Sequence, residues 1–386
     1  MGRRDDLEDR IRSAFSATNP KDVVMRKIAV ILTVILASCT SPEAPGSDTA
    51  QAPAAEATAL TWPAGLPVYD HVVIVVEENK DYAEIIGQLE AAPYINNVLK
   101  AEGANFTQAY GEEHYSQGNY YWLFSGDNQG VGFEDQIPGP GTPGYPFETA
   151  NLGSQLIERG LSFKGYAESL PAVGSTVDGA VDENGAKIYA RKHVPWISFR
   201  NVPNGTTVDT SSNLRFEDFP SDYDTLPTVA FVIPNLENDM HNGDPSRSIP
   251  AGDRWLRENL DAYYQWAKQN NSLLIVTFDE DNDRRGYTGL TDPFTEIPGG
   301  QSCKTEDRAS ELEDACEMRN GVVTIFAGAH IKPGDYAEGK GITHVNILRT
   351  LEAMYGLSRA GAQQRHAAAG GISDDYIITD VFESVR

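Results

Sequence analysis

Basic residues are scarce in this chain of 386 residues. Lysine and arginine together number 31 against 56 aspartates and glutamates, and the formal net charge is −25. Non-specific binding to nucleic acid requires a basic surface, so this charge balance excludes a general nucleic-acid-binding role. The same charge opposes contact with anionic lipids and phosphorylated substrates. Phosphate chemistry in such a protein therefore requires a local cation.

The sequence also lacks a hydrophobic run long enough to form a transmembrane helix. The apolar run Ile28–Leu36 follows the basic start Met25-Arg26-Lys27 and is too short to span a bilayer, as is typical of a signal peptide. It leads into Leu36-Ala37-Ser38-Cys39, which resembles the lipobox of bacterial lipoproteins. This resemblance implies that Cys39 carries lipid. The protein is then expected to be extracytoplasmic and anchored to a bacterial membrane through that lipid.

These signals divide the chain into four segments. Residues 1–24 precede a better start at Met25, and we interpret them as an over-long gene prediction or a cytoplasmic extension. Residues 25–39 form the signal peptide. Residues 40–65 are rich in Ala, Pro, Ser and Thr, which predicts a flexible tether. Residues 66–386 are predicted to form the folded domain.

Cysteine is rare, with three in the whole chain. If Cys39 carries lipid, Cys303 and Cys316 remain, and an extracytoplasmic location permits a disulfide between them. The bond would close a short loop and stabilise the fold by about 3 kcal/mol in the chain-entropy model. Two free thiols are the alternative.

One stretch, His71–Asn79, organises the rest of the chain. Five consecutive apolar residues, four of them valine, predict a strand buried on both faces. The strand ends in Glu77, Glu78 and Asn79. Open parallel sheets bind ligands beyond the carboxyl ends of their strands, so Glu78 and Asn79 are candidate ligands. An ordinary polar strand end is the alternative, and a recurrence of the pattern is needed to decide between the two.

The pattern recurs along the chain. Residues 228–233 form a predicted strand that precedes Asp239 and His241, and residues 272–278 form another that precedes Asp279 and Glu280. A further strand is predicted at residues 322–327. Helices predicted at 82–89, 93–101, 150–159, 255–269 and 345–355 alternate with these strands. This order predicts an α/β fold that is doubly wound, with a mostly parallel central sheet and helices on both faces.

Two further residues precede predicted helices. Ser116 lies where a loop enters a helix that ends at Gly126, and His344 opens the helix over 345–355. Backbone N–H groups at a helix N-terminus favour an anion, so Ser116 is a candidate nucleophile at a phosphate site. A plain N-cap serine is an equal alternative. His193 adjoins Arg191 and Lys192, a cation pair that favours a phosphate contact.

The oxygen-rich set of candidate ligands indicates a divalent metal ion. Carboxylate and amide oxygens suit Ca²⁺, Mg²⁺ or Mn²⁺, whereas Zn²⁺ prefers more nitrogen or sulfur. The identity of the ion stays open among these four. Such a cation would stabilise the alkoxide of Ser116 and neutralise a substrate phosphate inside an acidic protein.

The motifs as a set resemble the bacterial and fungal phosphoesterase family of the alkaline phosphatase superfamily, which contains acid phosphatases and phospholipases C. The matching segments run in the family's order and are His71–Asn79, His114–Gly126, Pro234–Gly243, Leu274–Asp281 and His344–Leu357. This resemblance implies an alkaline phosphatase-like fold and a phosphoserine intermediate on Ser116. It implies metal ligation by Glu78, Asn79, Ser116, Asp279 and Glu280.

The resemblance also assigns roles to the histidines. His114, His241 and His344 are expected to act in catalysis. Asp239, His193, His241 and His344 are expected to hold a second metal or the phosphate. The nucleophile loop departs from the family's His-Pro-Ser-x-Pro-Asn-Tyr pattern, because Tyr115 and Gly118 replace both prolines. This loop is therefore expected to be less rigid.

The sequence leaves three alternative functions for this protein. The first is a metal-dependent, acid phosphatase-like hydrolase of phosphate monoesters, which the short loop around Ser116 favours. The second is phospholipase C-like cleavage of phosphodiesters. The third is a lipoprotein that binds phosphorylated ligands without turnover, although a binder would be expected to have lost Ser116 or a metal carboxylate. The absence of a sulfatase motif argues against sulfate esters. The sequence leaves the oligomeric state open.

Overall fold

A computed structural model describes six segments of the chain, namely residues 63–112, 115–131, 135–282, 320–336, 341–361 and 376–383. Several predictions lie outside these segments. They concern the extension at 1–24, the signal peptide at 25–39, most of the tether at 40–65, and the individual residues Cys39, His114, Cys303 and Cys316.

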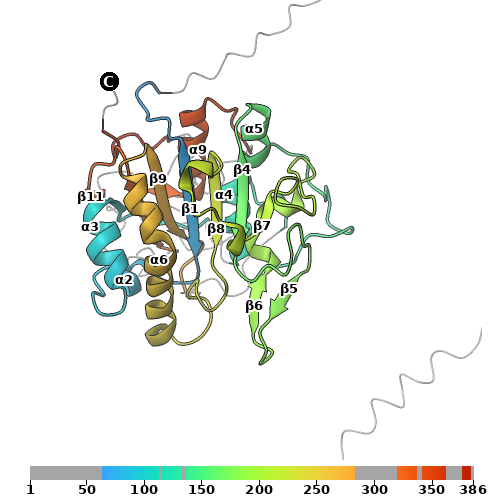
Figure 1. The fold of residues 1–386 in the computed structure, drawn as a ribbon, viewed down its shortest axis with the longest axis horizontal. Helices are drawn as coiled ribbons and strands as arrows, with labels where there is room; N and C mark the ends of the chain where they lie inside the picture. Colours follow the sequence, from blue (N-terminus) through green and yellow to red (C-terminus); the bar gives the residue numbers. More distant parts are fainter. Residues whose placement is uncertain are drawn as a thin grey trace, which may run out of the picture. The chain divides into compact units, whose positions relative to one another are not determined.

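An eight-stranded sheet forms the core of the protein (Figure 1). Its strand order is β11-β2-β10-β9-β1-β8-β4-β7. Strand β10 is antiparallel to both of its neighbours, and every other neighbouring pair is parallel. The strands of the sheet are β1 (His71–Glu77), β2 (Ala104–Phe106), β4 (Phe163–Ala167), β7 (Asn213–Arg215), β8 (Val229–Ile233), β9 (Ser272–Phe278), β10 (Thr324–Gly328) and β11 (Gly334–Tyr336).

Strand β1 lies in the middle of the sheet, as the run of β-branched residues predicts. Residues 72–76 are almost completely buried, and β1 pairs in parallel with β8 on one side and β9 on the other. The register sets Glu77 of β1 opposite Phe278 of β9. The strands that precede the candidate ligands therefore end at the same edge of the sheet.

Helices cover both faces of the sheet (Figure 1). On one face, α6 packs against β9 and β10, and α3 packs against β10 and β11. On the other face, α4, α5 and α9 contact one another. The predicted doubly wound, mostly parallel α/β fold is confirmed. The helices are α2 (Tyr82–Ile85), α3 (Lys100–Glu102), α4 (Ser116–Ser125), α5 (Leu152–Glu158), α6 (Pro245–Ala267) and α9 (His344–Tyr355).

Several element bounds differ from the prediction. The helix expected at 82–89 is the single turn α2, and the one expected at 93–101 is a π-helix, η1 (Ile95–Leu99), followed by α3. Helix α6 begins ten residues before the predicted start, because the Asp244 side chain caps it and Pro245 occupies its first position. Between β4 and β8 the chain forms a hairpin of β5 (Gly179–Val181) and β6 (Lys187–Ala190).

The remaining elements are short. A two-stranded parallel pair joins β3 (Ala109–Tyr110) and β12 (Ile342–Thr343), which lead toward α4 and α9 respectively. The single-turn helices are η2 (Arg191–His193), η3 (Pro195–Ser198), η4 (Phe216–Asp218) and η5 (Tyr223–Thr225). No helix among the described residues has the length and apolar character needed to cross a membrane.

Candidate functional site

The loops that leave β1, β8 and β9 are tied together at the carboxyl edge of the sheet. The backbone N–H of Glu78 donates to the Asp239 carbonyl at 2.7 Å, and that of Asp279 donates to the Glu77 carbonyl at 3.0 Å. The buried ammonium of Lys80 donates to the carbonyls of Asn79 at 2.9 Å and Met240 at 2.7 Å. These bonds hold three strand ends side by side, and with them their polar side chains.

Ser116 is the first residue of α4, and its hydroxyl faces this edge. Tyr115 before it has a φ of 81°, in the left-handed region, which turns the chain sharply into the helix. The Ser116 hydroxyl donates to Glu78 Oε2 at 3.1 Å and lies 3.5 Å from Glu280 Oε1. The Tyr115 N–H donates to Glu280 Oε2 at 2.8 Å. The structure thus brings the predicted nucleophile against two of the predicted metal ligands.

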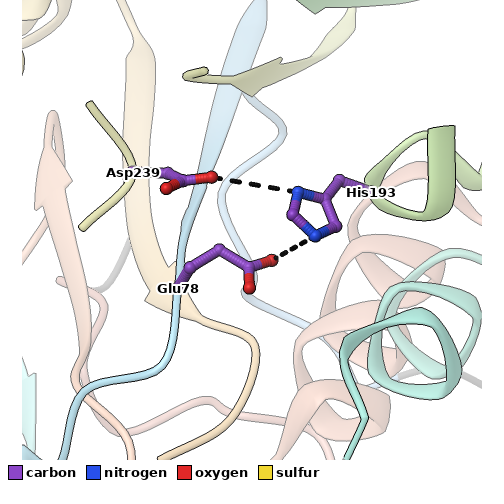
Figure 2. A group of neighbouring side chains, drawn as sticks. All are labelled: Glu78, His193 and Asp239. Carbon is purple, nitrogen blue, oxygen red and sulfur yellow. Dashed lines mark ion pairs between the residues drawn. The ribbon is translucent and has the colours of Figure 1, made fainter. Parts of the chain in front are cut away.

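Glu78 also faces a histidine and a second carboxylate (Figure 2). His193 Nε2 lies 3.1 Å from Glu78 Oε1, and His193 Nδ1 lies 3.8 Å from Asp239 Oδ2. One ligand atom from each of these three residues lies within 4.8 Å of the other two. Asn79 links two of the carboxylates. Its backbone N–H donates to Asp279 Oδ1 at 3.1 Å, and its side-chain amide donates to Glu78 Oε2 at 3.1 Å.

Burial makes these carboxyl groups weaker acids than usual. Desolvation, with the Asp239 charge nearby, raises the pKa of Glu78 to about 8. Desolvation likewise raises the pKa of Asp239 and of Asp279 well above the usual range. Buried carboxylates that crowd together are stable as anions only beside a cation.

The donor set fits a divalent metal ion. Asp239 Oδ2 and Asp279 Oδ2 are buried and accept no hydrogen bond, so each has a lone pair available to a cation. His193 adds an imidazole nitrogen to the predicted oxygen ligands, and a mixed nitrogen and oxygen set is compatible with Zn²⁺ as well as with harder ions. Among the described residues, Glu78, His193 and Asp239 are the three whose ligand atoms lie close enough together to hold one ion.

Burial favours the neutral form of the two histidines at the site. Desolvation, followed by the Lys192 charge, lowers the pKa of His193 well below its usual range. Desolvation also lowers the pKa of His241, whose Nδ1 faces Asn242 Oδ1 at 3.1 Å. The His241 ring lies 6.2 Å from the His193 ring, centroid to centroid. A neutral imidazole offers a lone pair, which is the form that a metal binds.

Two residues at the site fall outside the predicted set of ligands and catalytic groups. Lys192 Nζ lies 3.3 Å from Ser116 Oγ, so the cation noted beside His193 contacts the hydroxyl itself. The Tyr120 hydroxyl donates to Glu78 Oε1 at 2.7 Å, and its ring stacks on His193 with centroids 5.0 Å apart. Helical spacing is the signal that would have found Tyr120, because residues four apart share one helix face.

The structure places His344, a predicted catalytic or phosphate residue, between Glu112 and the carbonyl of Phe278. It is buried at the start of α9, and its Nδ1 faces Glu112 Oε2 at 2.6 Å. Its Nε2 faces the Phe278 carbonyl at 2.8 Å. Both ring nitrogens are therefore engaged with protein oxygens. Glu112 was not predicted, and its partner is 232 residues away in the chain.

The sequence matches known phosphatases over most of its length. A family model described as the phosphoesterase family matches residues 95–358. Phosphatidylinositol-3-phosphatase of Mycobacterium tuberculosis is 44% identical over 297 residues, which cover 77% of this chain and 80% of that protein. A probable acid phosphatase of Kluyveromyces lactis is 29% identical over 216 residues, which cover 54% of this chain and 46% of that protein.

Among solved structures, a protein of the alkaline phosphatase superfamily from Vibrio parahaemolyticus aligns with a TM-score of 0.45 at 11% identity. The alignment covers 76% of this chain and 69% of that one.

Proposed function

This chain belongs to the phosphoesterase family and is a hydrolase of phosphate esters, and from this premise we propose that it cleaves phosphate monoesters with Ser116 as nucleophile and a divalent cation bound. The observation that supports Ser116 is its position. Its hydroxyl lies at the N-terminus of α4, 3.1 Å from Glu78 and 3.3 Å from the Lys192 ammonium. A hydroxyl between an acceptor and a cation is suited to attack on phosphorus.

The proposed reaction has two steps. In the first, Glu78 Oε2 accepts the hydrogen bond of the Ser116 hydroxyl, which orients Oγ toward phosphorus. The Oγ–P bond forms as the Ser116 O–H bond and the ester P–O bond break, and the alcohol leaves with the proton that Ser116 loses. In the second, water attacks the phosphoserine, inorganic phosphate is released and Ser116 regains its proton. A bound divalent cation would supply positive charge that stabilises the serine oxygen and the phosphoryl group.

Lys192 supports a monoester as the substrate. A phosphate monoester carries up to two negative charges, and a protein of net charge −25 needs local cations to hold it. The Lys192 ammonium contacts the nucleophile and supplies such a charge. The mycobacterial relative is named phosphatidylinositol-3-phosphatase, and the 3-phosphate group of a phosphatidylinositol 3-phosphate is a monoester. We therefore propose this lipid as one substrate to test.

The test is hydrolysis by a soluble form of the protein from residue 50 to residue 386. An aryl phosphate, phosphatidylinositol 3-phosphate and a choline phosphodiester are offered side by side, with and without a chelator. We expect monoester cleavage that is lost in chelator and restored by a divalent cation. Preference for the diester would favour phospholipase C-like activity instead. Full activity in chelator, after dialysis to remove bound ions, would contradict the metal requirement.

We also propose that Cys39 carries the lipid anchor that the lipobox-like sequence predicts. Expression of the full chain in a bacterium with labelled fatty acid tests this directly. Label in the membrane fraction that disappears in Cys39→Ala would support the proposal, and a protein that partitions identically with and without the cysteine would contradict it.

A further inference from the structure

A carboxylate from another loop lies against the N-terminus of α4, next to Ser116. Asp135 Oδ1 accepts the backbone N–H of Gln117 at 3.3 Å. Asp135 Oδ2 lies 2.6 Å from Lys192 Nζ. The neighbouring residue is also bound to the helix, because the Gln117 side-chain amide donates to the Gln136 carbonyl at 2.6 Å. Asp135 therefore bridges the first turn of α4 and the lysine.

The same lysine contacts the nucleophile. Lys192 Nζ lies 3.3 Å from Ser116 Oγ, so one ammonium faces both the serine hydroxyl and the Asp135 carboxylate. Asp135 is the more accessible partner, since its side chain is 29% exposed against 14% for Lys192. The Asp135 carboxylate is therefore the end of this group that solvent reaches more easily.

The donors that Asp135 uses are those that a phosphoryl group needs. Backbone N–H groups at the start of a helix and a nearby ammonium are general binding partners for phosphate oxygens. A carboxylate presents two anionic oxygens, whereas a phosphoryl group presents three, so a carboxylate in this position resembles part of the substrate. It carries one negative charge, and the phosphoryl group of a monoester carries up to two.

We propose that Asp135 is an internal competitor for the phosphoryl site, and that the substrate displaces its carboxylate from Lys192 and from the Gln117 N–H. This inference rests on the proposed function, because it places the phosphoryl group beside Ser116. The exchange favours ligands with more charge than the carboxylate they replace. A monoester dianion displaces Asp135 readily, and a diester with a single charge gains little from the same exchange. Asp135 is therefore a specificity residue for monoesters.

Inorganic phosphate is the probe that tests the exchange without turnover. Its dissociation constant is measured by titration calorimetry for the wild type, Asp135→Asn, Lys192→Met and the double variant. The Asn side chain keeps the size of Asp and removes its charge. We expect Asp135→Asn to tighten phosphate binding by about fivefold, as loss of one partly exposed ion pair allows. We expect Lys192→Met to weaken it by about tenfold or more.

A matched control removes the carboxylate of an ion pair at the opposite edge of the sheet. Lys268 at the end of α6 lies 2.8 Å from Glu102 of α3, and Glu102→Gln changes the net charge by the same amount. We expect this variant to bind phosphate like the wild type. In the double variant the gain from Asp135→Asn should disappear, because the freed ammonium is then absent.

Three results would overturn the proposal. They are weaker or unchanged phosphate binding in Asp135→Asn, unchanged binding in Lys192→Met, and a gain in Glu102→Gln equal to that in Asp135→Asn. Thermal melting confirms that each variant is folded, and Asp135→Ser replaces Asp135→Asn should the latter not fold. Steady-state kinetics adds a second readout, a lower KM for an aryl phosphate in Asp135→Asn. A wild type that binds phosphate with these variant effects but hydrolyses no ester would contradict the proposed function alone.

Discussion

The imidazole of His344 and the carboxylate of Glu112 form a buried pair, with Nδ1 and Oε2 2.6 Å apart. The second ring nitrogen faces the Phe278 carbonyl, one residue before Asp279. Both partners are acceptors, so the ring donates twice and carries a positive charge. The pair thus joins the N-terminus of α9 to the end of β9. This geometry favours a positioning role for His344 over direct contact with phosphate.

Substitution of His344 should therefore destabilise the protein before it alters the chemistry. We expect His344→Gln to lower the free energy of unfolding by about 3–5 kcal/mol, because Glu112 is left buried without its cation. His71→Gln is the control, because His71 begins β1 and lies at the end of that strand away from the site. It should change the free energy of unfolding only slightly. Denaturant unfolding at neutral pH measures both. A stable His344→Gln protein without activity would instead support direct catalysis.

The His344 pair also has a pH signature. Burial alone lowers the pKa of His344, but the Glu112 charge and the hydrogen bonds to Glu112 and Phe278 raise it above the usual range overall. Its contribution to stability is therefore complete below the unfolded pKa of about 6.5 and is lost as the pH rises through the folded value. The stability difference between wild type and His344→Gln should shrink at alkaline pH. A difference that grows with pH would contradict this.

Ser116→Ala should abolish turnover and leave the fold intact. We expect kcat to fall by at least about a thousandfold and the free energy of unfolding to change by about 1 kcal/mol or less. Ser125→Ala is the matched control. Ser125 is buried at the other end of α4 and its hydroxyl donates to the Tyr121 carbonyl at 2.9 Å. The turnover of Ser125→Ala should match that of the wild type. Single-turnover assays that find equal rates in Ser116→Ala and wild type would exclude Ser116 as nucleophile.

Tyr120→Phe isolates the hydrogen bond that holds Glu78. The variant keeps the ring stacked on His193 and loses the 2.7 Å bond to Glu78 Oε1. We expect kcat/KM to fall by about tenfold, which corresponds to about 1.4 kcal/mol for a bond to a charged group. Tyr121→Phe is the control, because its hydroxyl donates to Ser198 Oγ and not to the site. Equal losses in the two variants would assign the effect to helix packing.

The metal-free protein should lose stability as the pH rises. Folding raises the pKa of Glu78 from 4.5 to about 8, so between these values the native state binds more protons than the unfolded state. Stability then falls by up to roughly 1.4 kcal/mol per pH unit for each such group. Melting temperatures in chelator across this range should show the fall, and an added divalent cation should remove it. Identical curves with and without the cation would count against the metal site.

Much of the fold could be predicted from local sequence. The valine-rich run of β1 is too short and too β-branched for a helix, and it is buried throughout. Gly126 and Gly356 both adopt left-handed φ at the predicted ends of α4 and α9. The predictions that failed concern short or interrupted elements. Helix α2 is a single turn, and α6 continues through Pro250, which local rules treat as a break.

The site could be predicted only in part. Glu78, Asp239, Asp279 and Glu280 could be predicted because they follow buried strands, and parallel strands bring their carboxyl ends to one edge of the sheet. Lys192 lies in the single-turn helix η2, and Asp135 and Glu112 lie in loops. In such short segments no periodicity indicates which way a side chain points. Their partners depend on how these segments pack.

The sequence by itself determined the order of the buried strands, the helices that begin at Ser116 and His344, and the acidic balance that makes a local cation necessary. These features depend on residues close together in the chain. Tertiary structure alone decided that Lys192 meets Ser116, that Asp135 accepts a hydrogen bond from the first turn of α4, and that His344 faces Glu112. Such contacts join segments that are distant in sequence, and their geometry is fixed only when the sheet and its helices pack into one core.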